Sequence, residues 1–244
     1  MSVVLVMKTE SPKLLARLAG VFFLLTILGG VVAQSFISDS LINYSDAAAT
    51  ANNILANRGM FQAGLTIFLI EMACQLITTA LLYRLLRPVN RTLALVMLLF
   101  ELMAITMKTF ARVFFISPLW VLEHGSALGG IGTEQLQSIA LVLLRINDIG
   151  AATAIAFFGF SGIPMGYLVY RSGFLPRWLG VIGMIAGLGW LTFLYPPLGR
   201  PLFIYIALFA LAGSAAKIFW LIVFGVDDEK FRAVESGGVT ELGN

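Results

Sequence analysis

Seven ionisable side chains lie inside long apolar runs of this 244-residue sequence, and they are the residues best suited to carry chemistry. Three of them, Glu101, Lys108 and Arg112, belong to one apolar stretch, residues 92–120. Helical steps of seven and four residues, at about 100° per residue, place these three on one stripe along about 16 Å of helix axis. The other four lie in three further apolar runs: Glu71 in one, Arg145 with Asp148 in the next, and Lys217 in the last.

These charges are expected to pair with one another across helices. A charge near the centre of a bilayer costs about 2.5–3.5 kcal/mol on insertion scales, which amounts to at most roughly 17–25 kcal/mol for seven unpaired groups. Glu101 and Lys217 lie closer to the cytoplasmic side and could pair with each other. Arg145 and Asp148 are three residues apart, so they can touch on one helix. Glu71, Lys108, Arg145 and Asp148 are expected at one level near the midplane of the membrane.

The charged residues allow two main interpretations. As a hydrated polar site, all seven would bind or move a small solute, a proton or a lipid head group. As a structural network, they would only fix how the helices pack. Four bases against three acids leave a slight cationic excess, which favours an anionic ligand. A remote alternative is an intramembrane enzyme that uses Glu71 and Asp148 as an acid/base pair.

The sequence contains few residues suited to catalysis or metal binding. Its single histidine, His124, is expected in a loop, which leaves no histidine cluster for zinc or haem and no Ser-His pair in the bilayer. Its single cysteine, Cys74, excludes an intrachain disulfide. No phosphate-binding or dinucleotide motif occurs. We therefore expect a non-enzymatic protein with no catalytic residues, no metal and no cofactor.

Composition predicts an all-α, polytopic integral membrane helical bundle. The chain is 59% hydrophobic and 12% charged, whereas soluble domains carry about 25% charged residues. We expect a single transmembrane domain over 14–224, between a cytoplasmic segment, 1–13, and a disordered cytoplasmic tail, 225–244. Pro118 is expected to end the third span, and residues 196–201 to form a stiff turn. The six predicted spans are 14–36, 60–82, 92–120, 136–170, 178–195 and 202–224.

The distribution of basic residues predicts the orientation and the partners. With six spans, ten lysines and arginines flank the side of the two termini and only Arg58 and Arg200 the other side, so both termini should be cytoplasmic. The net charge of +3 comes from short clusters between spans, so no nucleic-acid partner is expected. The expected partners are the lipid bilayer and a small solute or lipid. The oligomeric state stays open.

Two local patterns predict packing outside the charged residues. Ser45 or Asp46 can cap a short helix that lies on the membrane surface or acts as a lid. Glycines spaced by four, at 162 and 166 and at 183 and 187, allow helices to approach closely, which we interpret as packing within one chain.

Three stretches in this order resemble a known family. They are SDAAATANNI at 45–54, LYRLLRPVN at 82–90, and FFG at 157–159 followed by GYLVYRSGFLP at 166–176. The chain resembles a bacterial membrane family called domain of unknown function 4386, over about residues 14–224. The resemblance implies a multi-pass protein of the bacterial plasma membrane. It implies no activity, substrate or site.

Overall fold

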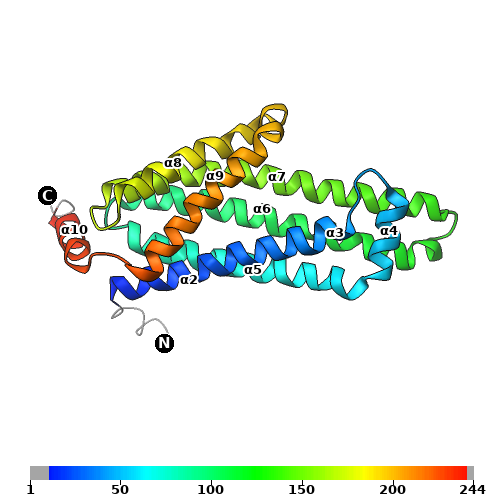
Figure 1. Cartoon of the computed structure of the whole chain (residues 1–244), viewed down its shortest axis with the longest axis horizontal. Coiled ribbons are helices and arrows are strands. Elements are labelled where there is room, and N and C mark those ends of the chain that lie inside the picture. Colours follow the sequence, from blue (N-terminus) through cyan, green and yellow to red (C-terminus); the bar gives the residue numbers. More distant parts are fainter. Residues whose placement is uncertain (1–10, 241–244) are drawn as a thin grey trace. The chain divides into compact units, whose positions relative to one another are not determined.

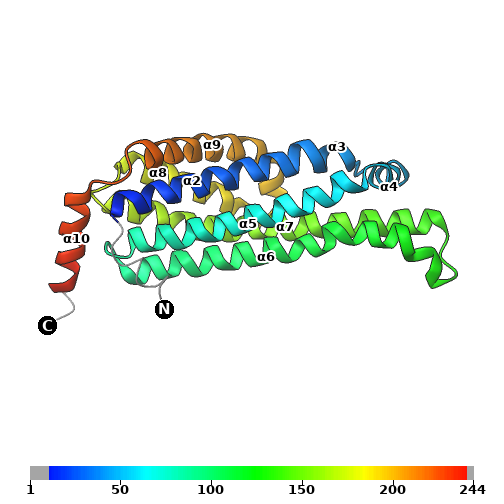
Figure 2. The same cartoon turned by 90° about the horizontal axis from the view of Figure 1, so that it is seen from below.

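The computed structural model describes residues 11–240, and these residues form helices and no strands. Short 3₁₀ turns at Gly125–Leu128 and Thr192–Leu194 follow α6 and α8, and a π-helical turn, Val32–Ser38, joins α2 to α3. The all-α prediction is confirmed (Figures 1 and 2). The α-helices are α2 (Pro12–Val31), α3 (Asp39–Leu41), α4 (Ala47–Ala56), α5 (Arg58–Leu86), α6 (Arg91–His124), α7 (Thr133–Arg171), α8 (Arg177–Leu191), α9 (Pro196–Val223) and α10 (Asp228–Thr240).

Within residues 11–240, six helical stretches are long and apolar enough to cross a membrane. Their lengths range from 18 to 39 residues, and about 20 apolar residues cross the hydrocarbon core of a bilayer. The prediction of a multi-pass membrane protein is confirmed. The six stretches are Pro12–Leu41, Arg58–Leu86, Arg91–His124, Thr133–Arg171, Arg177–Leu194 and Pro196–Val223.

Proline positions correct two predicted helix ends. Helix α6 continues through Pro118 to His124 instead of ending there. Proline lacks a backbone N–H and so removes one helical hydrogen bond, which membrane helices tolerate when other groups satisfy the freed carbonyl. Helix α9 begins at Pro196, so the expected stiff turn is helical. Pro196 and Pro197 fit there because the first N–H groups of a helix have no intrahelical acceptor, whereas Pro201 lies inside the helix.

The described chain divides into two compact units. Unit 1 comprises 11–24, 74–104 and 155–240, and unit 2 comprises Leu25–Ala73 and Ile105–Ala154. Helices α2, α5, α6 and α7 contribute residues to both units. The single transmembrane domain expected over 14–224 stays a prediction.

The core of unit 1 is mainly aliphatic and includes residues of α10, the last helix of the described residues. Leu85, Met97 and Leu168 are fully buried in it, and Phe231 of α10 packs against it with its ring 5.2 Å from that of Phe174. Because Phe231 and Val234 lie three residues apart, they face the same core.

The predicted disorder of the tail, 225–244, is wrong for residues 228–240, because they form α10. The carboxylate of Asp227 accepts the N–H of Lys230, as an N-cap does. This backbone bond, with the Lys230 ammonium beside it, holds the pKa of Asp227 below its usual range. Residues 241–244 of the predicted tail, like residues 1–10 of the predicted cytoplasmic segment, lie outside the described residues.

Three aromatic rings pack together in the core of unit 2. The ring of Phe115 stacks on Phe61 with centroids 4.6 Å apart and meets the edge of Phe68 at 5.4 Å. Helix α4 contributes the fully buried Ile54. The predicted cap is confirmed, because the N–H of Ala49 donates to Asp46 Oδ1 at 2.9 Å.

Helices α7 and α8 approach each other closely within unit 1. A Cβ built on Gly180 would lie 2.5 Å from the carbonyl oxygen of Gly166, and one on Gly162 would lie 3.2 Å from the Cα of Gly187. Side chains at these positions would force the two backbones apart. The predicted close packing of the glycine-rich segments within one chain is confirmed.

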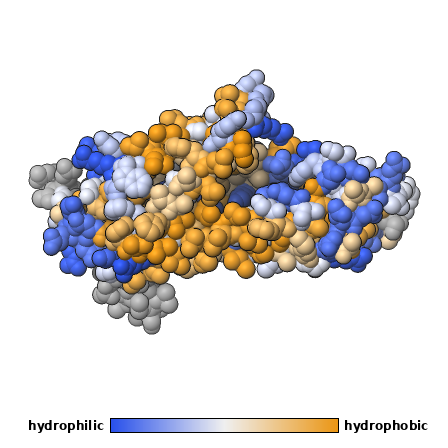
Figure 3. Space-filling model, in the orientation of Figure 1, coloured by the Kyte–Doolittle hydropathy of each residue, from blue (hydrophilic) through white to orange (hydrophobic). Residues whose placement is uncertain are grey.

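Large apolar side chains cover much of the outer surface of α2 and α9 (Figure 3). On α9, Tyr205, Leu208 and Phe219 are more than half exposed. Such a surface would be unusual for a soluble protein but matches a lipid environment.

Candidate functional site

The seven predicted site residues divide between the two units. Glu71, Lys108, Arg112, Arg145 and Asp148 belong to unit 2, whereas Glu101 and Lys217 belong to unit 1. Each set is described within its own unit.

In unit 2, α5 and α6 bring Glu71 and Lys108 together. Lys108 Nζ donates to Glu71 Oε1 at 2.6 Å, and the exposed fractions of the two side chains are 21% and 4%. The predicted interhelical pairing is confirmed for these two residues. Glu71 Oε2 is buried and accepts no hydrogen bond from the described residues.

Two glycines of α2 leave room for this carboxylate. A Cβ on Gly30 would lie 3.2 Å from Glu71 Oε1, and one on Gly29 would lie 3.3 Å from the Cβ of Glu71. Larger residues there would press on the ion pair. The sequence reasoning missed both glycines, although an adjacent glycine pair in an apolar helix is a visible signal for close packing.

Arg112 lies one helical turn beyond Lys108 on α6, and it is 4% exposed. Its Nη1 donates to Asn147 Oδ1 at 3.1 Å, and its guanidinium carbon lies 3.5 Å from the ring centroid of Phe68. No carboxylate among the described residues comes within 4 Å of it, and its Nε has no hydrogen-bond partner there. A neutral amide and an aromatic face therefore stabilise this cation.

Arg145 and Asp148 of α7 are exposed and do not form the predicted ion pair. No ion pair within 4 Å joins these two described residues. Instead, Arg145 Nη2 donates to the carbonyl of Tyr44 at 3.1 Å, and its guanidinium lies 4.3 Å from the ring centroid of Tyr44. The loop between α3 and α4 thus supplies a partner that helix spacing alone does not predict.

Tyr44 is itself influenced by these neighbours. Burial raises the pKa of its hydroxyl above the ordinary value, and the nearby charge of Asp148 raises it further. The phenol therefore stays protonated, and neutral, at physiological pH.

In unit 1, Glu101 is buried and is satisfied by neutral donors. Gln75 Nε2 donates to Oε1 at 3.1 Å, and the hydroxyl of Ser161 donates to Oε2. Because both carboxylate oxygens are occupied, the predicted ion pair with Lys217 is not needed, and none forms within 4 Å between these described residues.

Lys217 is surrounded by soft, polarisable groups. Its ammonium donates to Met165 Sδ at 3.5 Å and lies 5.7 Å from the ring centroid of Phe23. Thioether sulfur is a weak acceptor, so this bond compensates the charge only in part.

The sequence reasoning missed the neutral partners of the charged groups. These partners are amides, a hydroxyl and a phenol. In the sequence, each of them is recognisable as a polar side chain next to or inside an apolar run. Gln75, for example, follows Glu71 by one helical turn. The missed partners are Tyr44, Gln75, Asn147 and Ser161.

We refer to Glu71, Lys108, Arg112 and Asn147 as the unit 2 cluster. It holds two cations and one anion, a formal charge of +1 when all are ionised. Two buried atoms of the cluster have no hydrogen-bond partner among the described residues, Arg112 Nε and Glu71 Oε2. Among the residues that the structure describes, no group of three or more His, Cys, Asp and Glu side chains could hold a metal ion.

Comparison with known proteins assigns the chain to a family. Residues 18–225 match the family described as Domain of unknown function (DUF4386). The chain belongs to this family. This DUF4386 protein is also similar to an uncharacterized protein of the archaeon Archaeoglobus fulgidus, with 28% identity over 166 residues, which cover 65% of this chain and 81% of that relative. No solved structure matches it.

Family membership confirms the resemblance seen in the three sequence stretches. Neither the family description nor the archaeal relative assigns an activity or a residue. A bacterial origin stays a prediction.

Proposed function

We propose that this DUF4386 protein binds a small anionic solute at the unit 2 cluster and moves it across the membrane. The observation that carries the proposal is Arg112, a 4% exposed cation with no carboxylate within 4 Å among the described residues and an Nε without a partner. Ionised groups inside membrane proteins often mark substrate or ion pathways.

The charge balance of the cluster supports an anion as the ligand. Glu71 forms an ion pair with Lys108 at 2.6 Å, so the negative charge of Glu71 balances the positive charge of that lysine. Arg112 then contributes an uncompensated positive charge. A guanidinium presents its donors in a planar fork that matches carboxylate and phosphate oxygens.

We propose a non-enzymatic role, in the plasma membrane of a bacterium, with both termini in the cytoplasm. The orientation is supported by the ten basic residues on one side of the predicted spans against two on the other. The non-enzymatic role is supported by the scarcity of residues that perform acid/base or nucleophilic chemistry.

A structural role is the second candidate, and the close contact of Lys108 with Glu71 favours it. In that case the charges fix the register of α5 against α6, and Asn147 fixes α7 in the same way through Arg112. A structural cluster would bind no solute.

The test uses the full-length protein in nanodiscs and calorimetric titration with inorganic phosphate, acetate and succinate. We expect at least one of these anions to bind, and Arg112→Gln to weaken binding about tenfold or more, because a charge-assisted hydrogen bond is lost. The matched control is Arg58→Gln, which removes an arginine that is already paired with Glu123 at 2.9 Å and should leave binding unchanged.

Arg112→Lys guards against a folding defect, because it keeps the charge and loses the planar fork. It should retain the fold and bind more weakly than the wild type. Absence of binding by every probe, or equal binding by wild type and Arg112→Gln, would favour the structural role instead.

A further inference from the structure

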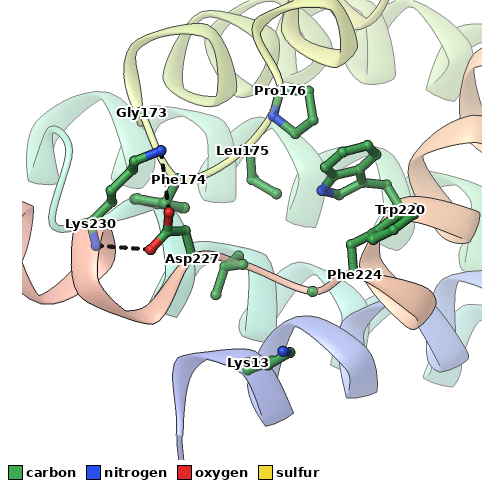
Figure 4. A pocket seen from close by; sticks show the side chains of 11 residues that line it. Lys13, Gly173, Phe174, Leu175, Pro176, Trp220, Phe224, Asp227 and Lys230 are labelled. Carbon is green, nitrogen blue, oxygen red and sulfur yellow. Dashed lines mark hydrogen bonds and ion pairs between the residues drawn. The ribbon is translucent and has the colours of Figure 1, made fainter.

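Within unit 1, helix α2 begins close to the place where α9 ends (Figures 1 and 2). There a pocket of about 460 Å³ opens between the first turn of α2, the turn before α8 and the segment between α9 and α10 (Figure 4). Residues 173–176 and 224–227 form much of its wall. It uses none of the residues of the unit 2 cluster.

Lysines provide the positive charge of this pocket. Lys230 and Asp227 neutralise each other, because Lys230 Nζ lies 3.2 Å from Asp227 Oδ2. The ammonium of Lys13 forms no ion pair with any described residue. Lys13 therefore leaves the pocket with a formal charge of +1.

The charged residues next to the pocket do not change its net positive charge. Asp228 accepts the backbone N–H of Lys13 at 3.1 Å, and Arg17 donates to the carbonyl of Val223 at 3.4 Å. This adds one anion and one cation near the pocket and leaves the balance positive.

An aromatic wall lies across the pocket from Lys230 (Figure 4). Trp220 and Phe224 line the pocket with ring centroids 4.5 Å apart, and Trp178 meets Trp220 edge-on at 6.3 Å. In Figure 4 the indole of Trp220 points toward the interior of the pocket. Tryptophan is enriched at the level of the lipid head groups, where one side of the ring is apolar and the other is wet.

An apolar surface continues from this wall along α9. Phe219, Val223 and Phe224 at the end of that helix are 59%, 46% and 50% exposed. A ligand that reaches the pocket from this surface needs an anionic group and a long apolar part in one molecule. A soluble anion would leave the apolar part of the surface unused.

We infer that this pocket binds the head group of an anionic phospholipid, with the phosphate at Lys13 and an acyl chain along the exposed end of α9. Trp220 lies between the two parts of the lipid and can donate its indole N–H to the phosphate–glycerol region. Basic residues near anionic lipid contribute about 1 kcal/mol each, so one free lysine gives a measurable preference.

The experiment is native mass spectrometry of the full-length protein in detergent, titrated with phosphatidylglycerol or phosphatidylcholine of the same acyl chains. We expect the wild type to retain phosphatidylglycerol in preference. Lys13→Gln should lower the affinity for it about fivefold. The matched control is Arg91→Gln, which removes an exposed basic residue of unit 1 that does not line the pocket.

A second variant, Trp220→Leu, tests the aromatic wall and should weaken retention of both lipids. Thermal melting of each variant checks that it folds. Lys13→Arg keeps the positive charge, so it should keep the preference for phosphatidylglycerol and provides the test if Lys13→Gln unfolds. Equal retention of the two lipids would overturn the inference. So would an effect of Lys13→Gln no larger than that of Arg91→Gln, or displacement of the lipid by millimolar inorganic phosphate.

This result is separable from the proposed solute binding. Arg112→Gln changes unit 2 and should leave the lipid preference unchanged, whereas Lys13→Gln should leave calorimetric anion binding unchanged.

Discussion

Glu71 and Lys108 show how one contact determines the behaviour of a buried charge. Removing one partner leaves the other buried and unpaired, which costs far more than the net stabilisation of the intact pair. The carboxylate of Glu71 can neither reach solvent nor move far, because its side chain is 4% exposed and the α2 backbone lies close to it at Gly30.

We therefore predict that Lys108→Met lowers the free energy of unfolding by about 3–5 kcal/mol. The exchanged pair, Glu71→Lys with Lys108→Glu, should recover a large part of this loss, because it restores opposite charges. Unfolding in mixed micelles, followed by circular dichroism, measures the difference.

The matched control is Arg58→Met, which breaks an ion pair with Glu123 whose side chains are 57% and 27% exposed. An exposed pair contributes about 0–1 kcal/mol, so this variant should change stability little. A Lys108→Met protein as stable as Arg58→Met would contradict the view that the buried pair holds the helices together.

At the scale of elements, the contact between α7 and α8 depends on glycine at particular positions. The two backbones are so close that a Cβ on Gly180 would meet the carbonyl oxygen of Gly166 at 2.5 Å and the backbone nitrogen of Tyr170 at 2.6 Å. Neither atom can move without moving its helix. A nearby glycine of the same helix, Gly183, would place its Cβ at an ordinary 3.5 Å from the Cα of Gly166.

We predict that Gly180→Ala destabilises the protein by about 1–3 kcal/mol, the usual cost of forcing extra atoms into a packed contact. Gly183→Ala serves as the control. It should be neutral or slightly stabilising, because alanine favours helix more than glycine does. Thermal melting in detergent compares the two, and an equal shift for both would show that close approach is not what Gly180 provides.

Helix ends also depend on context at this scale. The sequence predicted that prolines would end α6 and precede α9, yet Pro118 lies inside one helix and Pro196 begins the other. A proline removes one helical hydrogen bond but does not by itself end the helix. Whether the helix continues depends on which other group can donate to the freed carbonyl.

At the scale of the whole molecule, the open prediction is orientation. Basic residues concentrate on one side of the predicted spans, so the loop after α4 should face outward and the turn between α5 and α6 should face the cytoplasm. Asn57 lies in the loop after α4, Thr92 lies in the first turn of α6 next to the turn between α5 and α6, and both are exposed. The single native cysteine, Cys74, is buried.

We predict that, in a Cys74→Ser background, a membrane-impermeant maleimide labels Asn57→Cys in intact cells and labels Thr92→Cys only after lysis. Cys74→Ser alone is the blank. Labelling of Thr92→Cys in intact cells, with Asn57→Cys protected, would reverse the assigned orientation.

The all-α, multi-pass membrane class of this protein could be predicted from the sequence, because the backbone must satisfy its own hydrogen bonds inside a bilayer. Runs of this length and hydropathy can bury their peptide groups only as helices, so the six candidate spans followed from composition. Sequence also identified the charged residues, since ionisable groups stand out in apolar runs. Of the expected pairs, however, Arg145 with Asp148 and Glu101 with Lys217 were wrong.

The partner of each charged side chain became known only from the packing of the helices. Arg112 lies on Phe68 and Asn147, and Glu101 accepts from Gln75 and Ser161, so neutral groups stand where opposite charges were expected. The physical reason is that a partner must arrive within about 3 Å in the correct direction. That depends on how each helix is rotated and how closely its neighbours pack, and spacing along one helix does not contain this information.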